Sequence, residues 1–170
     1  MILEARHIVG AALIGLGATL VIDLWALLLR RGFNIPSLNY CLLGRWLLHM
    51  PEGTFMHEGI AAAAEKRNEC TVGWVAHYLI GTGFAVVFVL LVSGSWLERP
   101  TLLPALGFGM VTVLVPFLIM QPSYGLGIAG SKTPHPHQVR LKSLMTHTVF
   151  GAGLYLWASI LNLLGIVSFL

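Results

Sequence analysis

The sequence predicts an all-α integral membrane protein with four transmembrane helices, and three observations support that fold class. Of its 170 residues, 56% are hydrophobic and only 10% are charged, and the mean hydropathy is +0.81, which is unlike a soluble domain. Four apolar runs are long enough to cross a bilayer core of about 30 Å at ~1.5 Å per residue. They cover residues 8–29, 72–96, 102–120 and 144–169. We therefore expect one transmembrane domain, residues 1–170.

The first run combines a packing surface with one costly charge. Ala11, Gly15 and Ala18 fall on one helical stripe, which suits close contact between membrane helices. Asp23 precedes Arg30 by seven residues, so it lies about 10 Å below that end of the helix. A carboxylate at this depth is costly unless it is protonated, paired or hydrated. Asp23 is therefore expected either to join helices by hydrogen bonding or to line a functional site.

The first long loop, residues 30–71, is expected to contain a short amphipathic helix in the membrane interface. Residues 38–50 are largely apolar but too few to span a bilayer, and their aromatic residues suit the headgroup level. Arg45 and His49 are four residues apart and share one helical face. His57 follows in the same loop, and both histidines either approach the membrane site or are ordinary loop residues.

The third run should be irregular near its end. Pro116 removes one backbone hydrogen bond, so it should bend or locally open the helix. The run closes at Gln121, and the second long loop, residues 121–143, is rich in glycine but has no phosphate-binding pattern. His135 and His137 flank a proline there, and two histidines alone are weak evidence for a metal site.

A pattern H-x-x-x-G-x-G occurs twice, at residues 77–83 and 147–153, each time just inside an apolar run. Its residues are His77, Gly81, Gly83, His147, Gly151 and Gly153. The repeat suggests a duplicated helical hairpin. Small residues one turn deeper than a histidine indicate either a binding place or close packing between helices.

Topology places the end of the first run and the starts of the second and fourth at one face of the membrane. Asp23, His77 and His147 should therefore occupy one layer, roughly 8–10 Å deep by the helical rise. This layer predicts a polar pocket that binds a metal, haem or a small polar ligand. His49 is a further candidate ligand, and Arg45, His57 and Gln121 are expected to surround the ligating residues.

Two other functions stay open from the residues alone. Histidines near helix ends and regularly spaced glycines also serve packing, as in a structural or accessory membrane subunit. A small proton-coupled transporter would need a path through the opposite half of the bundle. No zinc-enzyme spacing such as H-E-x-x-H occurs, so the sequence assigns no catalytic residue and disfavours an enzyme. The cofactor stays unknown, with haem or a transition metal as candidates.

The basic residues predict the orientation in the membrane. Of the 10 Lys and Arg residues, only Arg6 and Arg99 lie outside the two long loops and their flanking helix ends. The others are Arg30, Arg31, Arg45, Lys66, Arg67, Lys132, Arg140 and Lys142. Because basic residues in short loops stay in the cytoplasm, both long loops should be cytoplasmic and both termini periplasmic. Anionic lipid accounts for this charge without a nucleic-acid partner.

The two cysteines, Cys41 and Cys70, lie on the predicted cytoplasmic side. Thiols are normally kept reduced there, so we expect no structural disulfide. The lipid bilayer is the one partner that the composition implies. Whether the chain forms a homo-oligomer or joins a membrane complex is left open by the sequence.

Several segments together resemble a known family. They are residues 23–25 (Asp-Leu-Trp), 36–50, 73–78, 121–122 (Gln-Pro) and 147–155. With them the chain resembles a bacterial inner-membrane family known only as domain-of-unknown-function family 2938, and the resemblance covers nearly the whole chain. It implies a small multi-pass protein of the bacterial inner membrane, and it carries no established activity, cofactor or catalytic residue.

Overall fold

The structure is a computed structural model that describes residues 5–92 and 95–166. Over these residues the regular elements are all helical and no strand occurs. Four helices are long and apolar enough to cross a membrane: His7–Phe33, Glu69–Val92, Leu102–Ser123 and Pro136–Leu163. The predicted all-α fold with four helices of spanning length is confirmed.

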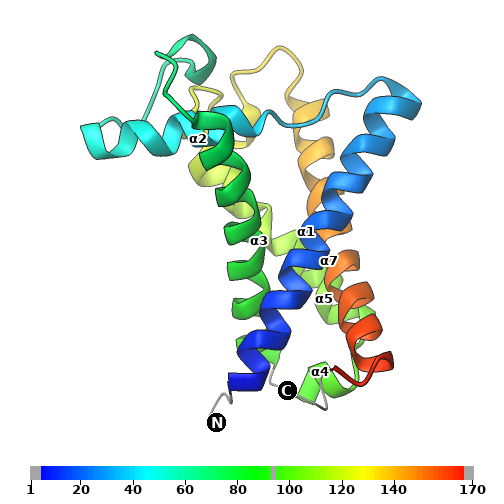
Figure 1. The fold of residues 1–170 in the computed structure, drawn as a ribbon. Helices are drawn as coiled ribbons and strands as arrows, with labels where there is room; N and C mark the ends of the chain where they lie inside the picture. The colour runs from blue at the N-terminus through cyan, green and yellow to red at the C-terminus, as the bar shows by residue number, and fades with distance from the viewer. Residues whose placement is uncertain (1–4, 93–94, 167–170) are drawn as a thin grey trace. The chain divides into compact units, whose positions relative to one another are not determined.

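Figure 1 shows the course of the chain. The α-helices are α1 (Ala5–Phe33), α2 (Tyr40–His49), α3 (Glu69–Val92), α4 (Ser95–Glu98), α5 (Leu102–Thr112), α6 (Gln121–Ser123) and α7 (Pro136–Leu163). Three 3₁₀ turns lie at Met50–Glu52, Ile60–Ala62 and Ile128–Gly130. A π-helical turn, Pro116–Met120, lies between α5 and α6.

The chain divides into two compact units. Unit 1 comprises Met1–Ser37, Tyr78–Val111 and Thr146–Leu170, and unit 2 comprises Leu38–His77 and Thr112–Met145. Both α3 and α7 therefore contribute residues to each unit.

The spanning helices differ from the predicted runs mainly at their ends. α7 begins at Pro136, eight residues before the predicted run, because proline suits the first helical position with its fixed φ and missing N–H. α3 begins at Glu69 and is described as far as Val92. The predicted second run continued to residue 96, and residues 93–94 of it lie outside the described part of the chain.

The short helix predicted at residues 38–50 is present as α2. Asn39 caps it, because the Asn39 side chain accepts a hydrogen bond from the Cys41 backbone N at 3.0 Å. The predicted opening at Pro116 is also confirmed, since residues 116–120 form a π-helical turn.

Unit 1 has a core of large apolar side chains, of which Ile14, Phe88, Phe150 and Leu154 are almost fully buried. Around this core the helices contact one another at glycine residues, where no side chain separates the two backbones.

Gly15 of α1 lies against the Thr82 backbone of α3, and Gly153 of α7 lies against Ala18 of α1. Small residues that let backbones touch are the usual means by which membrane helices gain packing energy.

The contact between α5 and α7 is the closest kind, backbone against backbone. A Cβ atom added at Gly109 would lie 2.5 Å from the His147 carbonyl oxygen and 2.6 Å from the Gly151 Cα. A Cβ atom added at Gly151 would lie 2.5 Å from the Ala105 carbonyl oxygen. Neither position has room for a side chain unless the two helices separate.

Replacing Gly109 with alanine should therefore lower the stability of the protein. We expect Gly109→Ala to reduce the free energy of unfolding by about 1–3 kcal/mol, the usual cost of overpacking, as measured by thermal or denaturant unfolding in detergent micelles. Gly107→Ala on the same helix is the matched control, because nothing lies within 4 Å of its added Cβ. Equal destabilisation by both variants would contradict the packing.

Candidate functional site

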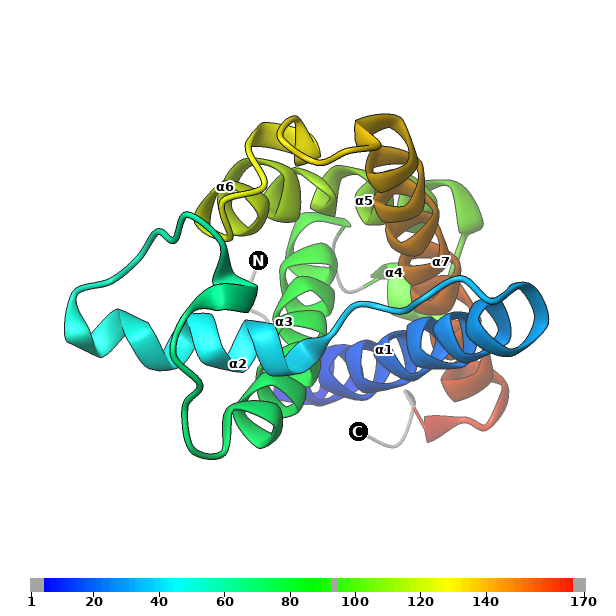
Figure 2. The same ribbon diagram turned by 90° about the horizontal axis from the view of Figure 1, so that it is seen from above.

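In unit 2, α2 crosses the first turns of α3 with the two backbones in contact (Figure 2). A Cβ atom added at Gly44 of α2 would overlap the Glu69 carbonyl of α3, and one added at Gly73 would overlap the Tyr40 carbonyl of α2. Glycine is required at both positions, because any side chain would force the helices apart.

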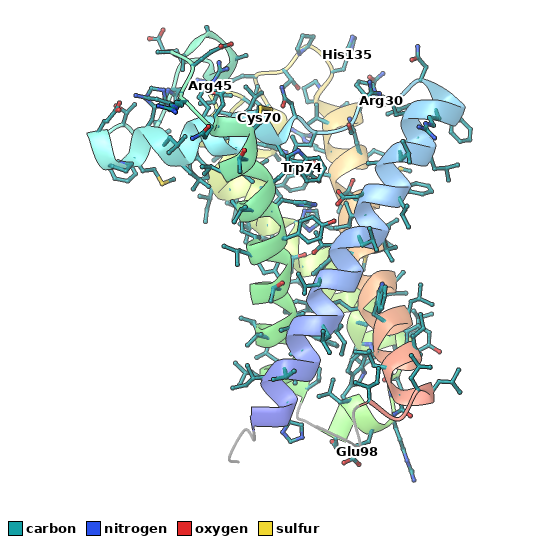
Figure 3. The ribbon with its side chains drawn as sticks, viewed as in Figure 1. Arg30, Arg45, Cys70, Trp74, Glu98 and His135 are labelled. Atoms are coloured by element: carbon teal, nitrogen blue, oxygen red, sulfur yellow. A yellow bond between two sulfur atoms is a disulfide. The ribbon has the colours of Figure 1, made fainter. Side chains whose placement is uncertain are left out.

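A disulfide between Cys41 and Cys70 lies one turn from this crossing (Figure 3). The Sγ–Sγ distance is 2.04 Å and the two Cα atoms are 3.8 Å apart. The expectation that these two thiols stay reduced, with no disulfide between them, is therefore wrong for this structure. It rested on the predicted compartment, whereas the pairing follows from the close crossing of two helices that each carry cysteine three residues before the contact glycine. Closing a loop of sequence separation 29 stabilises a fold by about 3–4 kcal/mol.

Arg45 is the centre of the polar contacts beside the crossing (Figure 3). Its guanidinium donates to both carboxylate oxygens of Glu69, from Nε at 2.8 Å and from Nη2 at 2.7 Å. Its Nη1 donates to the carbonyls of Ala61 at 3.3 Å and Ala63 at 3.0 Å. The Arg45 side chain is only 7% exposed, and hydrogen bonding to Glu69 raises the pKa of Arg45. One buried cation thus joins α2, the start of α3 and the loop between them.

Removing the charge of Glu69 should strongly destabilise unit 2. Glu69→Gln leaves the buried Arg45 cation without its bidentate partner, so we expect a loss of about 3–5 kcal/mol in the free energy of unfolding. Glu65→Gln is the matched control. Glu65 contacts the same guanidinium at 3.3 Å but is 85% exposed, and an exposed pair contributes about 0–1 kcal/mol. Denaturant titration of both variants makes the comparison, and similar losses would contradict the assignment.

His49 and His57 lie together, with ring centroids 5.0 Å apart. The protein engages both nitrogens of His49: Nε2 lies 3.0 Å from the Ala64 carbonyl oxygen and Nδ1 lies 3.4 Å from the Glu52 carboxylate. Glu52 also accepts a hydrogen bond from Lys66, which lowers the pKa of Glu52.

Burial, followed by the charge of His49, lowers the pKa of His57. This histidine is therefore held neutral.

The lowered pKa of His57 predicts acid sensitivity with a defined sign. Below the ordinary histidine value of 6.5 the unfolded chain binds a proton that the folded chain does not, so stability falls as pH falls. We expect the free energy of unfolding to decline between about pH 7 and pH 5, and His57→Gln to flatten that decline. His135→Gln, a change at an exposed loop histidine, should leave the profile unchanged, and a flat wild-type profile would contradict the assignment.

Residues 57–60, in the loop between α2 and α3, pack on residues 123–125 through backbone hydrogen bonds. The His57 N donates to the Ser123 carbonyl at 2.9 Å, and the Ile60 N donates to the Tyr124 carbonyl at 3.2 Å. Gly125 follows with a φ of +82°, in the left-handed region that favours glycine. A Cβ atom added there would overlap the Glu58 carbonyl.

From α2, the Trp46 ring meets the Tyr124 ring edge-on, with centroids 5.8 Å apart. The Trp46 Nε1 donates to the Phe55 carbonyl at 2.8 Å. One face of α2, carrying Trp46 and His49, therefore covers Tyr124 and His57.

Three buried polar atoms of unit 2 have no hydrogen-bond partner: His57 Nε2, Gln121 Oε1 and Tyr124 OH. Gln121 is 4% exposed and Tyr124 is 3% exposed. The Gln121 amide nitrogen donates to Ser143 Oγ at 3.3 Å, so one end of this side chain is paired and its oxygen is not. Burial raises the pKa of Tyr124, which keeps its phenol protonated as a donor.

The three residues of the predicted membrane layer belong to different units, Asp23 and His147 to unit 1 and His77 to unit 2. Asp23 accepts a hydrogen bond from the Tyr78 hydroxyl at 2.8 Å, which links α1 to α3.

His77 stacks on Tyr40, with ring centroids 4.0 Å apart and planes 24° apart. Trp74 meets the His77 ring edge-on at 5.9 Å. Over residues 5–92 and 95–166, no group of three or more His, Cys, Asp or Glu side chains is arranged to hold a metal ion.

A comparison with known families identifies the chain. The family described as "Protein of unknown function (DUF2938)" matches residues 12–161. The chain belongs to this family. The match covers all of unit 2, most of unit 1 and every residue of the site described above. No curated protein and no solved structure matches the chain.

Within this DUF2938 chain, the glycines of the repeated pattern have different surroundings. Gly81 lies against the Thr19 side chain, while Gly151 and Gly153 lie against the backbones of Ala105 and Ala18. Gly83 has nothing within 4 Å of an added Cβ. Three of the four glycines therefore make close helix contacts.

Sequence reasoning missed Glu69, Tyr78 and Tyr124. Glu69 stands at the end of a charged run, residues 65–69, and Tyr78 directly follows His77. One available signal was the pattern C-x-x-G, which occurs in α2 at residues 41–44 and in α3 at residues 70–73. It marks the two surfaces that meet.

Proposed function

We propose that this DUF2938 protein binds a small, neutral, polar organic ligand in unit 2, through His57, Gln121 and Tyr124. One observation carries the proposal: three buried polar atoms on contacting segments have no protein partner. A buried donor or acceptor left unpaired costs about 1–3 kcal/mol, and proteins pair the large majority of such groups. A ligand that hydrogen-bonds to them would recover that energy.

The donor set favours an organic ligand over a metal or haem. His49 is engaged through both ring nitrogens, whereas His57 Nε2 is buried without a protein partner. Its companions are an amide oxygen and a phenol, which are poor ligands for the transition metals that imidazole suits. The pocket predicted from the sequence, lined by Asp23, His77 and His147, takes no part in this proposal.

The surroundings define the class of ligand. Gln121 Oε1 is an acceptor and requires a donor on the ligand, while the Tyr124 hydroxyl donates or accepts. The Trp46 and Tyr124 rings, which meet edge-on, supply apolar surface beside these groups. Two charged residues nearby, Arg45 and Glu52, are already paired with Glu69 and Lys66, which favours a neutral ligand over an ion. The proposal is therefore a ring or short chain that carries a hydroxyl or amide.

We also infer that the protein resides in a bacterial inner membrane with the two long loops in the cytoplasm. The support is the strong bias of Lys and Arg toward those loops. On this orientation the ligand would come from the cytoplasm.

A structural or accessory role is the second candidate, and a specific observation favours it. The Asp23 carboxylate is hydrogen-bonded by Tyr78, and three glycines of the repeated pattern make helix contacts. These contacts give the costly membrane residues a packing role that needs no ligand.

The test of ligand binding is a comparison of co-purified small molecules. The protein is purified from native membranes in mild detergent, denatured, and its extract analysed by mass spectrometry. We expect one neutral polar compound at near-stoichiometric amount in the wild type, reduced about tenfold in Tyr124→Phe, in line with the loss of one or two hydrogen bonds.

Tyr155→Phe is the matched control, because it removes a phenol hydroxyl from unit 1. It should retain the compound in full. If no compound is enriched in the wild-type extract, the result would contradict ligand binding and leave the accessory role. A visible spectrum with a haem band, or stoichiometric metal, would contradict the organic class of ligand.

A further inference from the structure

We propose that the Cys41–Cys70 disulfide is a reversible redox clasp between α2 and α3, opened by a low-molecular-weight thiol of the glutathione class. The proposal is independent of the ligand site. It uses the crossing of α2 and α3 and the exposure and helix positions of the two cysteines.

The two cysteine residues differ in exposure. Cys70 is exposed, whereas Cys41 is partly buried. An incoming thiolate therefore reaches the Cys70 Sγ first, because exchange requires approach along the sulfur–sulfur axis from an open side. The attack forms a bond from the external sulfur to Cys70 Sγ and breaks the bond to Cys41 Sγ, which leaves as a thiolate.

The second step completes the reduction. A second external thiolate attacks the external sulfur of the mixed disulfide, and Cys70 leaves as a thiolate. Two external thiols are oxidised to one disulfide, and the protein disulfide gains two electrons. The two protons released by the external thiols are taken up by the protein thiolates or by the solvent. The reverse sequence, with the oxidised external disulfide, closes the clasp.

Helix geometry stabilises both leaving thiolates. Cys41 is the second residue of α2 and Cys70 is the second residue of α3. The start of a helix favours negative charge, since its backbone N–H groups are not yet paired within the helix. Glu69 beside Cys70 would oppose this effect, but Arg45 neutralises it through two hydrogen bonds. A stabilised reduced form makes a disulfide easier to reduce.

The reduced protein keeps other contacts between the helices. The Arg45–Glu69 pair and the stacking of His77 on Tyr40 do not depend on the disulfide. Reduction would therefore loosen α2 without unfolding unit 2.

Reversible reduction also agrees with the cytoplasmic location that the basic loops predict for both cysteines. A disulfide on the cytoplasmic side is normally transient or redox-sensing instead of structural.

The experiment uses the full chain in native membrane vesicles, opened to the reagents and never denatured. Vesicles are equilibrated with mixtures of reduced and oxidised glutathione, and free thiols are then trapped with a maleimide that retards the protein on a gel. We expect the oxidised fraction to follow the glutathione ratio, with the same midpoint approached from either direction. Backbone amides of α2 should exchange hydrogen about tenfold faster after reduction.

Two cysteine variants identify the gel bands that correspond to one trapped thiol and to none. Cys70→Ser should show one trapped thiol in reduced glutathione and should form no intrachain disulfide at any ratio. The combined variant Cys41→Ser with Cys70→Ser should show none, and its α2 amides should exchange like those of the reduced wild type.

Three outcomes would overturn the clasp. They are a pair that stays oxidised until the protein is denatured, which means a purely structural disulfide; a pair that never oxidises; and a bond that joins two copies of the chain.

Discussion

The backbone contact at Gly44 and Gly73 is the constraint on which unit 2 depends. Because neither position holds a side chain, α2 lies directly on the start of α3. That approach brings Cys41 to Cys70 and Arg45 to Glu69. Arg45 in turn binds the carbonyls of the loop between the helices, so the loop that carries His57 is ordered by the same contact. A disulfide or an ion pair alone would not place these groups, since each needs the helices already close.

Much of the fold follows from sequence patterns that have the same effect in any tertiary arrangement. Apolar runs of sufficient length become helices because the bilayer leaves no alternative for the backbone, and Pro116 must open the ladder wherever its helix lies. Helix ends are harder. α7 extends back to Pro136 through Arg140 and Lys142, since charged residues end an apolar run without ending a helix.

The site was harder to predict, for a reason that Asp23 illustrates. The helical rise gives the depth of a residue along its helix, but not the direction in which the side chain points. Equal depths therefore predict a layer shared by Asp23, His77 and His147, but depth alone does not indicate the hydrogen bond that Asp23 accepts from the Tyr78 hydroxyl. The disulfide was missed for another reason. Compartment rules concern where thiols survive, while the C-x-x-G pattern of both helices concerns whether two sulfurs can meet.

The account rests on α2 and α3 meeting at their glycines, and the most direct test is a non-reducing peptide map of the protein purified in air. The account predicts one linked pair of peptides that contains Cys41 and Cys70 from the same chain. Alkylated cysteines without a linked pair after mild oxidation, or linkage between two chains, would contradict the crossing of α2 and α3.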